Sequence, residues 1–501
     1  MRPLEITILL ALLVLVLGVL IPRLGRAPAL RFVCWAGALL TVLHLALEGY
    51  RWQMVPAYVL TAIFLALSLR RRQVPHAPAT SASRWRWVRR ICAGAGLLLV
   101  LGFAAALPAL FPVFKLPAPT GSLAVGTTNI SLLDRSRAEP FTPDEADRRD
   151  LAIQIWYPAT PVPGAKPESL RGAYSPRATF LTRLLGLSKL TFLFDHLALV
   201  EAHSYRDAPL SDAQAAFPVL IFSHGYWGSP DQNTAQVEEL ASHGYVVLSI
   251  GHPYESMELR YADGRIVKPT EEFLQRIEGY SRKPDFGAAL WKLVASKDPD
   301  ERASLLQAHG TADGHFPQSL KVWTADTRFV IDELEKAADV SALRRFAGHL
   351  DLTRIGVFGM SFGGATAADV CFLDSRCRAG VNMDGVQFGA TTTLDSAMKV
   401  PFMYMTSEPF KLLADPVFRR SQAPAWLLST AGSAHVSYTD LVLFSPLLHM
   451  GGITGRIDGG RMEQIMNAYL LAFFDQTLRG KPSPLLQGPS PAYPEVTLQV
   501  R

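Results

Sequence analysis

The stretch RIGVFGMSFGG, residues 354–364, decides the fold of most of this chain. Its first part, Arg354–Phe358, is a predicted strand, and a predicted helix begins at about Phe362. Between them, Gly359, Ser361 and Gly363 form the pattern G-x-S-x-G. A sharp strand-to-helix turn strains the serine backbone, and side chains two residues either way would collide. The sequence therefore predicts an elbow that lifts the Ser361 hydroxyl clear of the backbone. A helix-entry turn with an N-capping serine is the alternative interpretation.

Strand and helix patterns alternate on both sides of this elbow. The other predicted strands are Leu151–Tyr157, Phe217–Phe222, Tyr245–Ile250, Arg378–Met383, Pro401–Met405 and Ala425–Ser429. The predicted helices are Asn233–Ser242, Leu320–Ala338, Phe362–Phe372 and Met462–Arg479. Several strands are continuous apolar runs, as in sheets that are buried on both faces. Strands joined by helical crossovers predict an α/β fold, with a mostly parallel sheet and helices on both faces.

A serine hydroxyl needs a general base to act as a nucleophile at neutral pH. The base follows the serine in the chain when the serine lies in such an elbow, and only His435 and His449 follow Ser361. His435 lies in a loop of small residues after the last predicted strand, where it can reach the elbow. His449 lies in an apolar stretch and fits packing better, and His224 precedes Ser361. We therefore predict His435 as the base.

An acid between Ser361 and His435 would orient the imidazole and stabilise its cation. Asp384 directly follows the predicted strand Arg378–Met383, so it emerges at the same sheet edge as Ser361. An Asp-Gly turn is the structural alternative for this residue. Glu408, which follows the next predicted strand, is the competing acid. Asp384 is the predicted member of the triad.

Two backbone N–H groups are predicted to stabilise the oxyanion of an acyl-transfer reaction. The N–H of Phe362 lies at the start of the elbow helix and faces the developing charge. The second donor should come from the loop after an earlier strand, where Ser223–Gly228 reads SHGYWG. Tyr226 is the predicted donor, and Gly225 lets the backbone approach. His224 then shapes the loop and takes no part in proton transfer.

Residues 1–114 have the pattern of a membrane region. Four apolar stretches without Asp, Glu, Lys or Arg lie there: Ile6–Pro22, Phe32–Leu47, Met54–Leu69 and Ile91–Phe114. Each has about the length that crosses a hydrocarbon core, roughly 17–25 residues. We predict four transmembrane helices. A buried globular helix, or a cleaved signal peptide for the first stretch, is the alternative interpretation.

The charges in this region predict its orientation. Residues 1–114 contain twelve arginines, no lysine and two glutamates, whereas the remainder of the chain carries a net charge of −5. Ten of these arginines lie in the first and third loops, which the positive-inside rule places in the cytoplasm. The predicted location is therefore a multi-pass plasma (inner) membrane protein, with an extracytoplasmic or periplasmic domain after Lys115.

Composition excludes several other classes of protein. The overall charge of +5 belongs to the arginine-rich membrane region, so it does not indicate nucleic-acid binding. Four cysteines are too few for a disulfide-stapled scaffold or a cysteine-rich metal cluster, and no metal or cofactor is predicted. Cys34 and Cys92 fall in the apolar stretches. Cys371 and Cys377 would form a disulfide in an extracytoplasmic domain.

The predicted organisation has four parts: the membrane region 1–114, a proline-containing linker 115–120, the α/β domain 121–480 and a proline-rich tail 481–501. Within the domain, Phe180–Val200 is rich in leucine and phenylalanine. Such a segment fits a lid or bilayer-facing helix that brings lipid esters to the serine. Ordinary core packing explains it equally well.

Four segments of the α/β domain are distinctive in combination: Ser223–Gly225, Gly359–Thr366, Asn382–Gly385 and Gly432–His435. Together they resemble the plasma-type platelet-activating-factor acetylhydrolase family of the α/β-hydrolases. Ile155–Pro158 also looks like the early strand of that family. The resemblance implies Ser361, Asp384 and His435 as the triad, with Tyr226 and Phe362 as oxyanion donors. It further implies cleavage of short or oxidised acyl groups from phospholipids, without metal or calcium.

Three functional hypotheses follow. The first is a membrane-anchored serine ester hydrolase whose partners are membrane lipids and an ester or phospholipid substrate. The second is a general carboxylesterase acting on small or polymeric esters. The third is a non-enzymatic membrane sensor or assembly protein with a hydrolase-like domain. The sequence does not identify protein partners.

Overall fold

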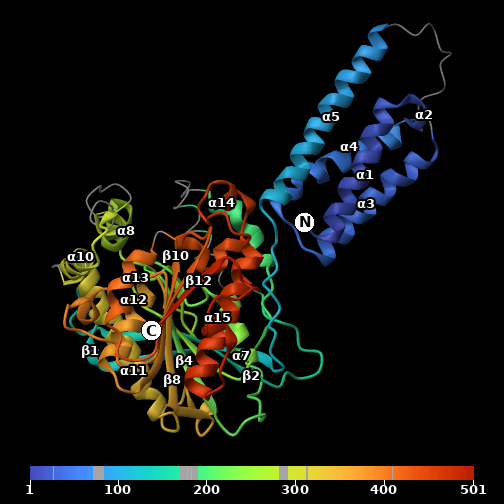
Figure 1. Cartoon of the computed structure of the whole chain (residues 1–501). Helices are drawn as coiled ribbons and strands as arrows, with labels where there is room; N and C mark the ends of the chain where they lie inside the picture. Colours follow the sequence, from blue (N-terminus) through green and yellow to red (C-terminus); the bar gives the residue numbers. More distant parts are fainter. Residues whose placement is uncertain are drawn as a thin grey trace. The chain divides into compact units, whose positions relative to one another are not determined.

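The computed structural model describes residues 1–25, 27–70, 84–169, 178, 182, 190–280, 292–311, 314–408 and 410–501. The chain divides into two compact units (Figure 1). The first unit contains Met1–Lys115, the described residues of 170–200, and Phe444–Leu447. The second contains Leu116–Ser169, Glu201–Leu443 and Leu448–Arg501. Two short segments from the later sequence thus join the N-terminal unit, which differs from the contiguous division that the sequence predicts.

The second unit is built on a ten-stranded mixed sheet, ordered β12-β11-β10-β9-β8-β4-β5-β2-β1-β3. Six central strands are parallel: β11 (Ala425–Thr430), β10 (Phe402–Ser407), β9 (Cys377–Met383), β8 (Leu350–Met360), β4 (Phe217–Ser223) and β5 (Val246–Gly251). All are present where the apolar runs predict them, with ends shifted by a few residues. The mostly parallel α/β sheet is therefore confirmed.

Helices cover both faces of this sheet (Figure 1). On one face lie α11 (His315–Glu335), α12 (Phe362–Leu373) and α13 (Lys411–Arg420), whose apolar residues share a core with the sheet. On the other face lie α7 (Thr234–Ser242) and α15 (Gly459–Arg479). Both cores contain buried strand residues, which explains why the central strands are apolar throughout.

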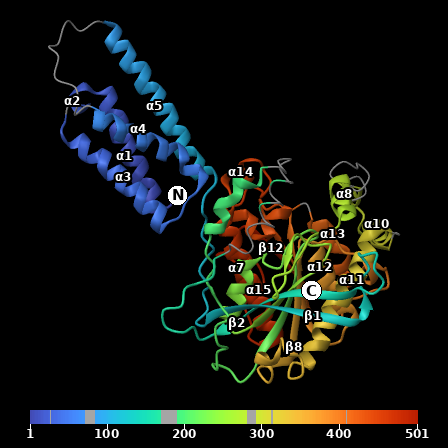
Figure 2. The same ribbon diagram turned by 180° about the vertical axis from the view of Figure 1, so that it is seen from behind.

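Antiparallel strands extend the sheet at both edges. At one edge, β5 pairs with β2 (Arg148–Ala159), which pairs with the long β1 (Ala124–Ala138), seen in cyan in Figure 2. The short β3 (Ser204–Arg206) follows β1. At the other edge, β12 (Val496–Val500) pairs with β11. The stretch 481–501 is therefore not only a tail, because its last residues complete the sheet.

Among its described residues, the first unit contains four helices long and apolar enough to cross a membrane: Pro3–Leu20, Ala29–Leu47, Trp52–Arg70 and Trp87–Leu110. The helices labelled there are α1 (Pro3–Leu20), α3 (Ala29–Leu47), α4 (Val55–Arg70) and α5 (Arg84–Leu110), with the short α2 (Pro22–Gly25) between α1 and α3. Their inward residues form one apolar core. Large apolar side chains also point outward, such as Phe32, Leu39 and Leu99.

The described part of the predicted lid packs within this first unit. Residues 191–199 form the 3-10 helix η3 (Thr191–Leu199). The Gln53 side-chain amide lies 2.9 Å from His196 Nδ1, and Trp52 Nε1 donates to the Leu193 carbonyl at 3.3 Å. The ring of Phe111 makes edge contacts with Phe194. Residues 191–199 therefore pack against helices of the first unit, although Phe192 remains exposed. Most of 180–189 lies outside the described residues, and a lid function stays a prediction.

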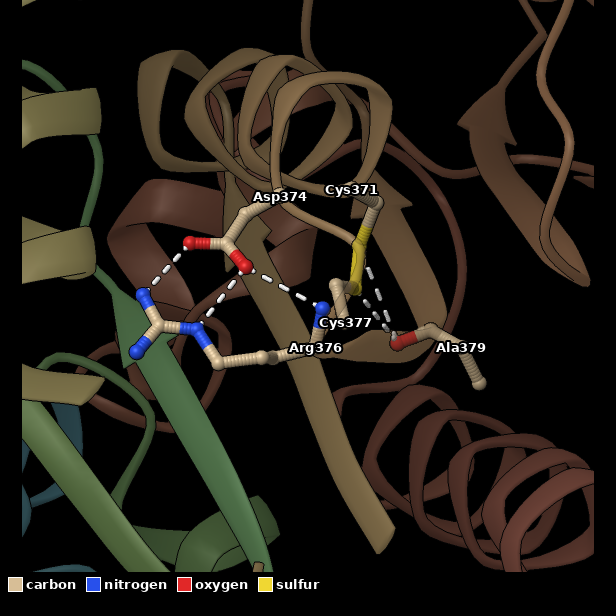
Figure 3. Close-up of a disulfide and its surroundings, with 5 residues drawn as sticks. All are labelled: Cys371, Asp374, Arg376, Cys377 and Ala379. Atoms are coloured by element: carbon tan, nitrogen blue, oxygen red, sulfur yellow. Dashed lines mark hydrogen bonds and ion pairs between the residues drawn. A yellow bond between two sulfur atoms is a disulfide. The ribbon is translucent and has the colours of Figure 1, made fainter. Parts of the chain in front are cut away.

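Cys371 and Cys377 form a disulfide, the pairing suggested by the sequence (Figure 3). The bond joins the last turn of α12 to the first residue of β9, so it closes the connection between these two elements. In the same turn, the Asp374 carboxylate accepts two hydrogen bonds from the Arg376 guanidinium, at 3.0 and 2.7 Å. These bonds lower the pKa of Asp374 to about 2.

Candidate active site

Ser361 lies at the predicted turn between β8 and α12. Its backbone has φ 56° and ψ −118°, a conformation that L-residues rarely adopt. The Ser361 N–H donates to the Met383 carbonyl at 2.8 Å, which holds the turn against the next strand. A Cβ on Gly363 would overlap the Ser223 carbonyl, and one on Gly359 would overlap the backbone of Gly363. The elbow therefore requires both glycines, for the steric reason that the sequence suggests.

The structure brings Ser361, His435 and Asp384 together in one hydrogen-bonded chain. His435 Nε2 lies 3.0 Å from Ser361 Oγ, and His435 Nδ1 lies 2.8 Å from Asp384 Oδ2. An ionised carboxylate only accepts hydrogen bonds, so Nδ1 carries the proton and Nε2 is left to accept from the serine hydroxyl. The imidazole is about one-third exposed, whereas the aspartate side chain is fully buried. This is the arrangement that a serine nucleophile and its base require.

Asp384 is held in place by the end of the neighbouring strand. Its own N–H donates to the Met405 carbonyl at 2.7 Å, and its φ is 57°. The Ser407 N–H donates to Oδ1 at 2.6 Å, and the Ser407 hydroxyl donates to Oδ2 at 3.0 Å. With His435 these donors fix both carboxylate oxygens. Ser407 is not among the residues predicted from the sequence. It ends strand β10, which pairs with the strand before Asp384, and this position could have indicated that it contacts Asp384.

The competing candidates lie elsewhere. Glu408 is exposed and accepts a hydrogen bond from the Gly432 N–H at 3.2 Å. His449 lies exposed on the short helix α14 (Pro446–Met450), so the prediction that it is packed is wrong. His224 is buried, with Nε2 2.7 Å from Ser256 Oγ and Nδ1 2.7 Å from the Gly225 carbonyl. Burial lowers the pKa of His224 to about 3, so its imidazole stays neutral and shapes the loop.

The loop predicted to supply the second oxyanion donor lies against the elbow. A Cβ on Gly225 would lie 3.4 Å from Ser361 Cβ and 3.1 Å from Met360 Sδ. The rings of Tyr226 and Phe362 contact each other edge to face, with centroids 5.1 Å apart. Both residues therefore lie beside Ser361, and the Phe362 N–H opens helix α12. Their role as donors to one oxyanion stays a prediction.

Phe410 is a further site residue that is absent from the sequence-based prediction. Its ring stacks on the His435 imidazole, with centroids 5.0 Å apart and an interplanar angle of 17°. This contact covers one face of the ring and restricts its rotation. An aromatic residue in the loop after a strand carries no distinct sequence signal.

Among the described residues, one group of side chains has the spacing of metal ligands: Glu5, His44 and Glu48 in the first unit. The Arg2 guanidinium lies among them, with Nε 2.8 Å from Glu5 Oε1 and a terminal nitrogen 3.2 Å from His44 Nε2. Arg2 thus supplies the positive charge that a metal ion would bring.

A serine on a strand-to-helix elbow, with an acid and a histidine from later strand ends of a parallel sheet, defines the α/β-hydrolase class. The sequence model of platelet-activating factor acetylhydrolase, isoform II, matches residues 109–285 and 321–482. The chain therefore belongs to this family, and it is an ester hydrolase. The non-enzymatic hypothesis does not agree with this assignment.

Several curated proteins are similar to this chain. Platelet-activating factor acetylhydrolase of Cavia porcellus is 26% identical over 312 residues, which cover 60% of this chain and 66% of the relative. The Gallus gallus protein of the same name is 24% identical over 386 residues (73% and 84%). A probable 1-alkyl-2-acetylglycerophosphocholine esterase of Arthroderma benhamiae is 23% identical over 421 residues (76% and 93%).

A solved structure is similar in fold. Ferulic acid esterase from Streptomyces cinnamoneus superposes with a TM-score of 0.57 and is 26% identical. The match covers 77% of this chain and all of that chain. It supports both the α/β-hydrolase fold and the class of ester hydrolases.

Proposed function

We propose that this protein is a membrane-anchored serine ester hydrolase that cleaves short or oxidised acyl esters of phospholipids through an acyl-enzyme. The observation that carries the proposal is the hydrogen-bonded chain from Ser361 through His435 to Asp384. It occurs in a chain whose relatives are named for platelet-activating factor and for 1-alkyl-2-acetylglycerophosphocholine.

The side chains of the site account for each step of the reaction. Ser361 Oγ attacks the ester carbonyl while His435 Nε2 takes the hydroxyl proton, and Asp384 stabilises the imidazolium. The N–H groups of Tyr226 and Phe362 stabilise the oxyanion of the tetrahedral intermediate. When the intermediate collapses, the imidazolium gives its proton to the leaving alcohol. A water molecule, deprotonated by His435, then releases the acid and restores Ser361.

The anchor is proposed from the first unit. Its four apolar helices have the length of membrane spans. By the positive-inside rule, the arginine-rich first and third loops lie on the cytoplasmic side. The catalytic domain, which follows the fourth helix, then lies on the opposite, extracytoplasmic or periplasmic side. The Cys371–Cys377 disulfide supports this orientation, since disulfides persist in oxidising compartments. Protease digestion of intact spheroplasts tests the orientation: complete protection of the catalytic domain would contradict it.

A carboxylesterase acting on small or polymeric esters is the second candidate function. The observation that favours it is the similarity to ferulic acid esterase over all of that chain. Both candidate functions use the same triad, so the triad does not distinguish them. They differ in the ester that the enzyme prefers.

The test is a panel of esters presented to the detergent-solubilised and vesicle-reconstituted full chain. The panel contains phosphatidylcholines with an acetyl, an oxidised or a long acyl group at position 2, together with p-nitrophenyl acetate and a feruloyl ester. Ser361→Ala should abolish turnover and fluorophosphonate labelling, whereas Ser304→Ala, on an exposed helix surface, should change neither. Preference for the short-acyl phospholipid supports the first function. Turnover of the soluble esters alone would replace it by the second.

A further inference from the structure

A second loop lies directly behind the proposed oxyanion donor. It comprises residues 252–257 and follows strand β5, whereas Tyr226 belongs to the loop after β4. Two backbone hydrogen bonds join the loops: Trp227 N–H to the Glu255 carbonyl at 3.2 Å, and Met257 N–H to the Gly228 carbonyl at 2.8 Å. Trp227 has φ 62° and Tyr254 has φ 67°. Both loops thus hold a strained residue beside these bonds, which indicates a conformation imposed by the surroundings.

Glu255 is the residue through which this second loop contacts Tyr226. Its side chain is buried, with 1% of the residue exposed. The Tyr226 hydroxyl donates to Oε1 at 2.9 Å, the Ser319 hydroxyl donates to the same oxygen, and Trp323 Nε1 donates to Oε2 at 2.9 Å. Burial raises the pKa of the Glu255 carboxyl, and these three donors oppose the rise. One carboxyl therefore ties the tyrosine to two residues of helix α11.

The partners of Glu255 on α11 are themselves fixed. Trp323 is fully buried and stacks on the His252 ring, with centroids 3.8 Å apart. His252 Nδ1 lies 2.8 Å from Asp326 Oδ2, and Asp326 pairs with the buried Arg149 at 2.7 Å. Glu255 thus joins the Tyr226 loop to a rigid, fully buried network. These bonds restrict the movement of the Tyr226 loop.

We propose that Glu255 is a positioning residue for the oxyanion hole, because its carboxyl holds the Tyr226 side chain and so fixes where the Tyr226 N–H points. The inference rests on the proposed function. It goes beyond that function because the side-chain hydrogen bonds of Glu255 join it to Tyr226, Ser319 and Trp323, none of which belongs to the triad. A misplacement of about 1 Å can cost about 10²-fold in rate, so the position of this N–H matters to catalysis.

The experiment compares Glu255→Leu, Glu255→Gln and Tyr226→Phe in the full chain, with active sites counted by fluorophosphonate titration. Glu255→Leu removes all three acceptor contacts and should lower kcat by about tenfold to a hundredfold. KM should change by less than about threefold, because Glu255 is buried and its replacement leaves the exposed side chains of the site as they are. Glu255→Gln should recover most of kcat, since its carbonyl accepts from Trp323 and its amide can donate to the two hydroxyls.

Tyr226→Phe keeps the ring and the N–H but removes the hydroxyl that Glu255 holds. It should lower kcat by about threefold to tenfold and should add little in a double variant with Glu255→Leu, because both changes break one contact. It also keeps the inference testable if Glu255→Leu does not fold.

Glu238→Gln is the matched control, because Glu238 is also buried and accepts N–H bonds, from His203 and Ser204, but lies on α7. Its kcat per titrated site should equal that of the wild type. Wild-type kcat in both Glu255→Leu and Tyr226→Phe, a raised KM with kcat unchanged, or additive effects in the double variant would overturn the inference. An active Ser361→Ala variant would overturn the proposed function instead.

Discussion

Replacing Asp384 by asparagine should inactivate the enzyme while preserving the shape of its site. In the native site Oδ1 accepts the Ser407 N–H at 2.6 Å, so the amide oxygen of asparagine will take this position. The amide NH₂ group then occupies the position of Oδ2, which in the native site lies 2.8 Å from His435 Nδ1. Nδ1 must become the unprotonated nitrogen, which puts the proton on Nε2. The base that should accept the Ser361 proton is then lost.

The size of the effect follows from this exchange of tautomer. The analogous aspartate-to-asparagine change in a serine protease lowers kcat by about 10⁴-fold, and the same geometry predicts a similar loss here. That factor corresponds to about 5.5 kcal/mol of transition-state stabilisation. KM should change little, because Asp384 is buried and does not reach the substrate.

Initial rates on p-nitrophenyl acetate, normalised to the protein concentration, measure the effect, and thermal unfolding verifies that the variant is folded. Glu408→Gln is the control, because Glu408 is the competing acid and bonds to the Gly432 N–H. It should keep kcat within about threefold. A folded Asp384→Asn variant with more than about one-tenth of the wild-type kcat, or a greater loss in Glu408→Gln, would refute this assignment.

Three further changes test the scaffold of the site. Gly363→Ala should abolish activity, because its Cβ would overlap the Ser223 carbonyl, whereas Gly488→Ala, with open space around it, should leave activity unchanged in the same assay. Replacing both Cys371 and Cys377 by serine removes a short cross-link worth about 2 kcal/mol and should lower Tm by several degrees in a thermal scan; an unchanged Tm would contradict this. Because the pKa of Asp374 is about 2 in the folded protein and 3.8 in the unfolded chain, the Asp374 carboxylate stabilises the fold above pH 3.8, and this contribution is lost as the pH falls toward 2. The free energy of unfolding, measured between about pH 5 and pH 2, should therefore depend less on pH in Asp374→Asn than in the wild type.

The core of the site could be predicted because its chemistry is local in sequence. Gly359, Ser361 and Gly363 form a steric pattern that few other turns need. Asp384 and His435 could be chosen because strand ends of a parallel sheet meet at one edge and because the chain order of the triad excludes earlier histidines. The geometry of all three residues agrees with that reasoning.

The remaining features depend on contacts between distant segments. The edge strand β12 consists of a few alternating residues after prolines, and it becomes a strand only because β11 offers an unpaired edge. Glu255 lies in a mixed, charged insertion, and nothing in its neighbourhood predicts that it meets Tyr226 and Trp323. The packing of residues 190–200 likewise depends on Trp52 and Phe111, which lie far away in the sequence.

The segments that join the N-terminal unit have a practical consequence for recombinant production. Phe444 stacks on Phe114, and Ser445 Oγ donates to the Leu110 carbonyl at 2.5 Å, beside the contacts of Phe192 and Phe194 with Trp52 and Phe111. In a truncated enzyme that begins at Leu116, Phe444 would lose Phe114, Phe192 would lose Trp52 and Phe194 would lose Phe111. The buried rings of Phe194 and Phe444 would then become exposed to water. Such a version should aggregate unless detergent or polar replacements at Phe192, Phe194 and Phe444 cover the loss, so removing the helices alone will not yield a well-behaved soluble catalyst.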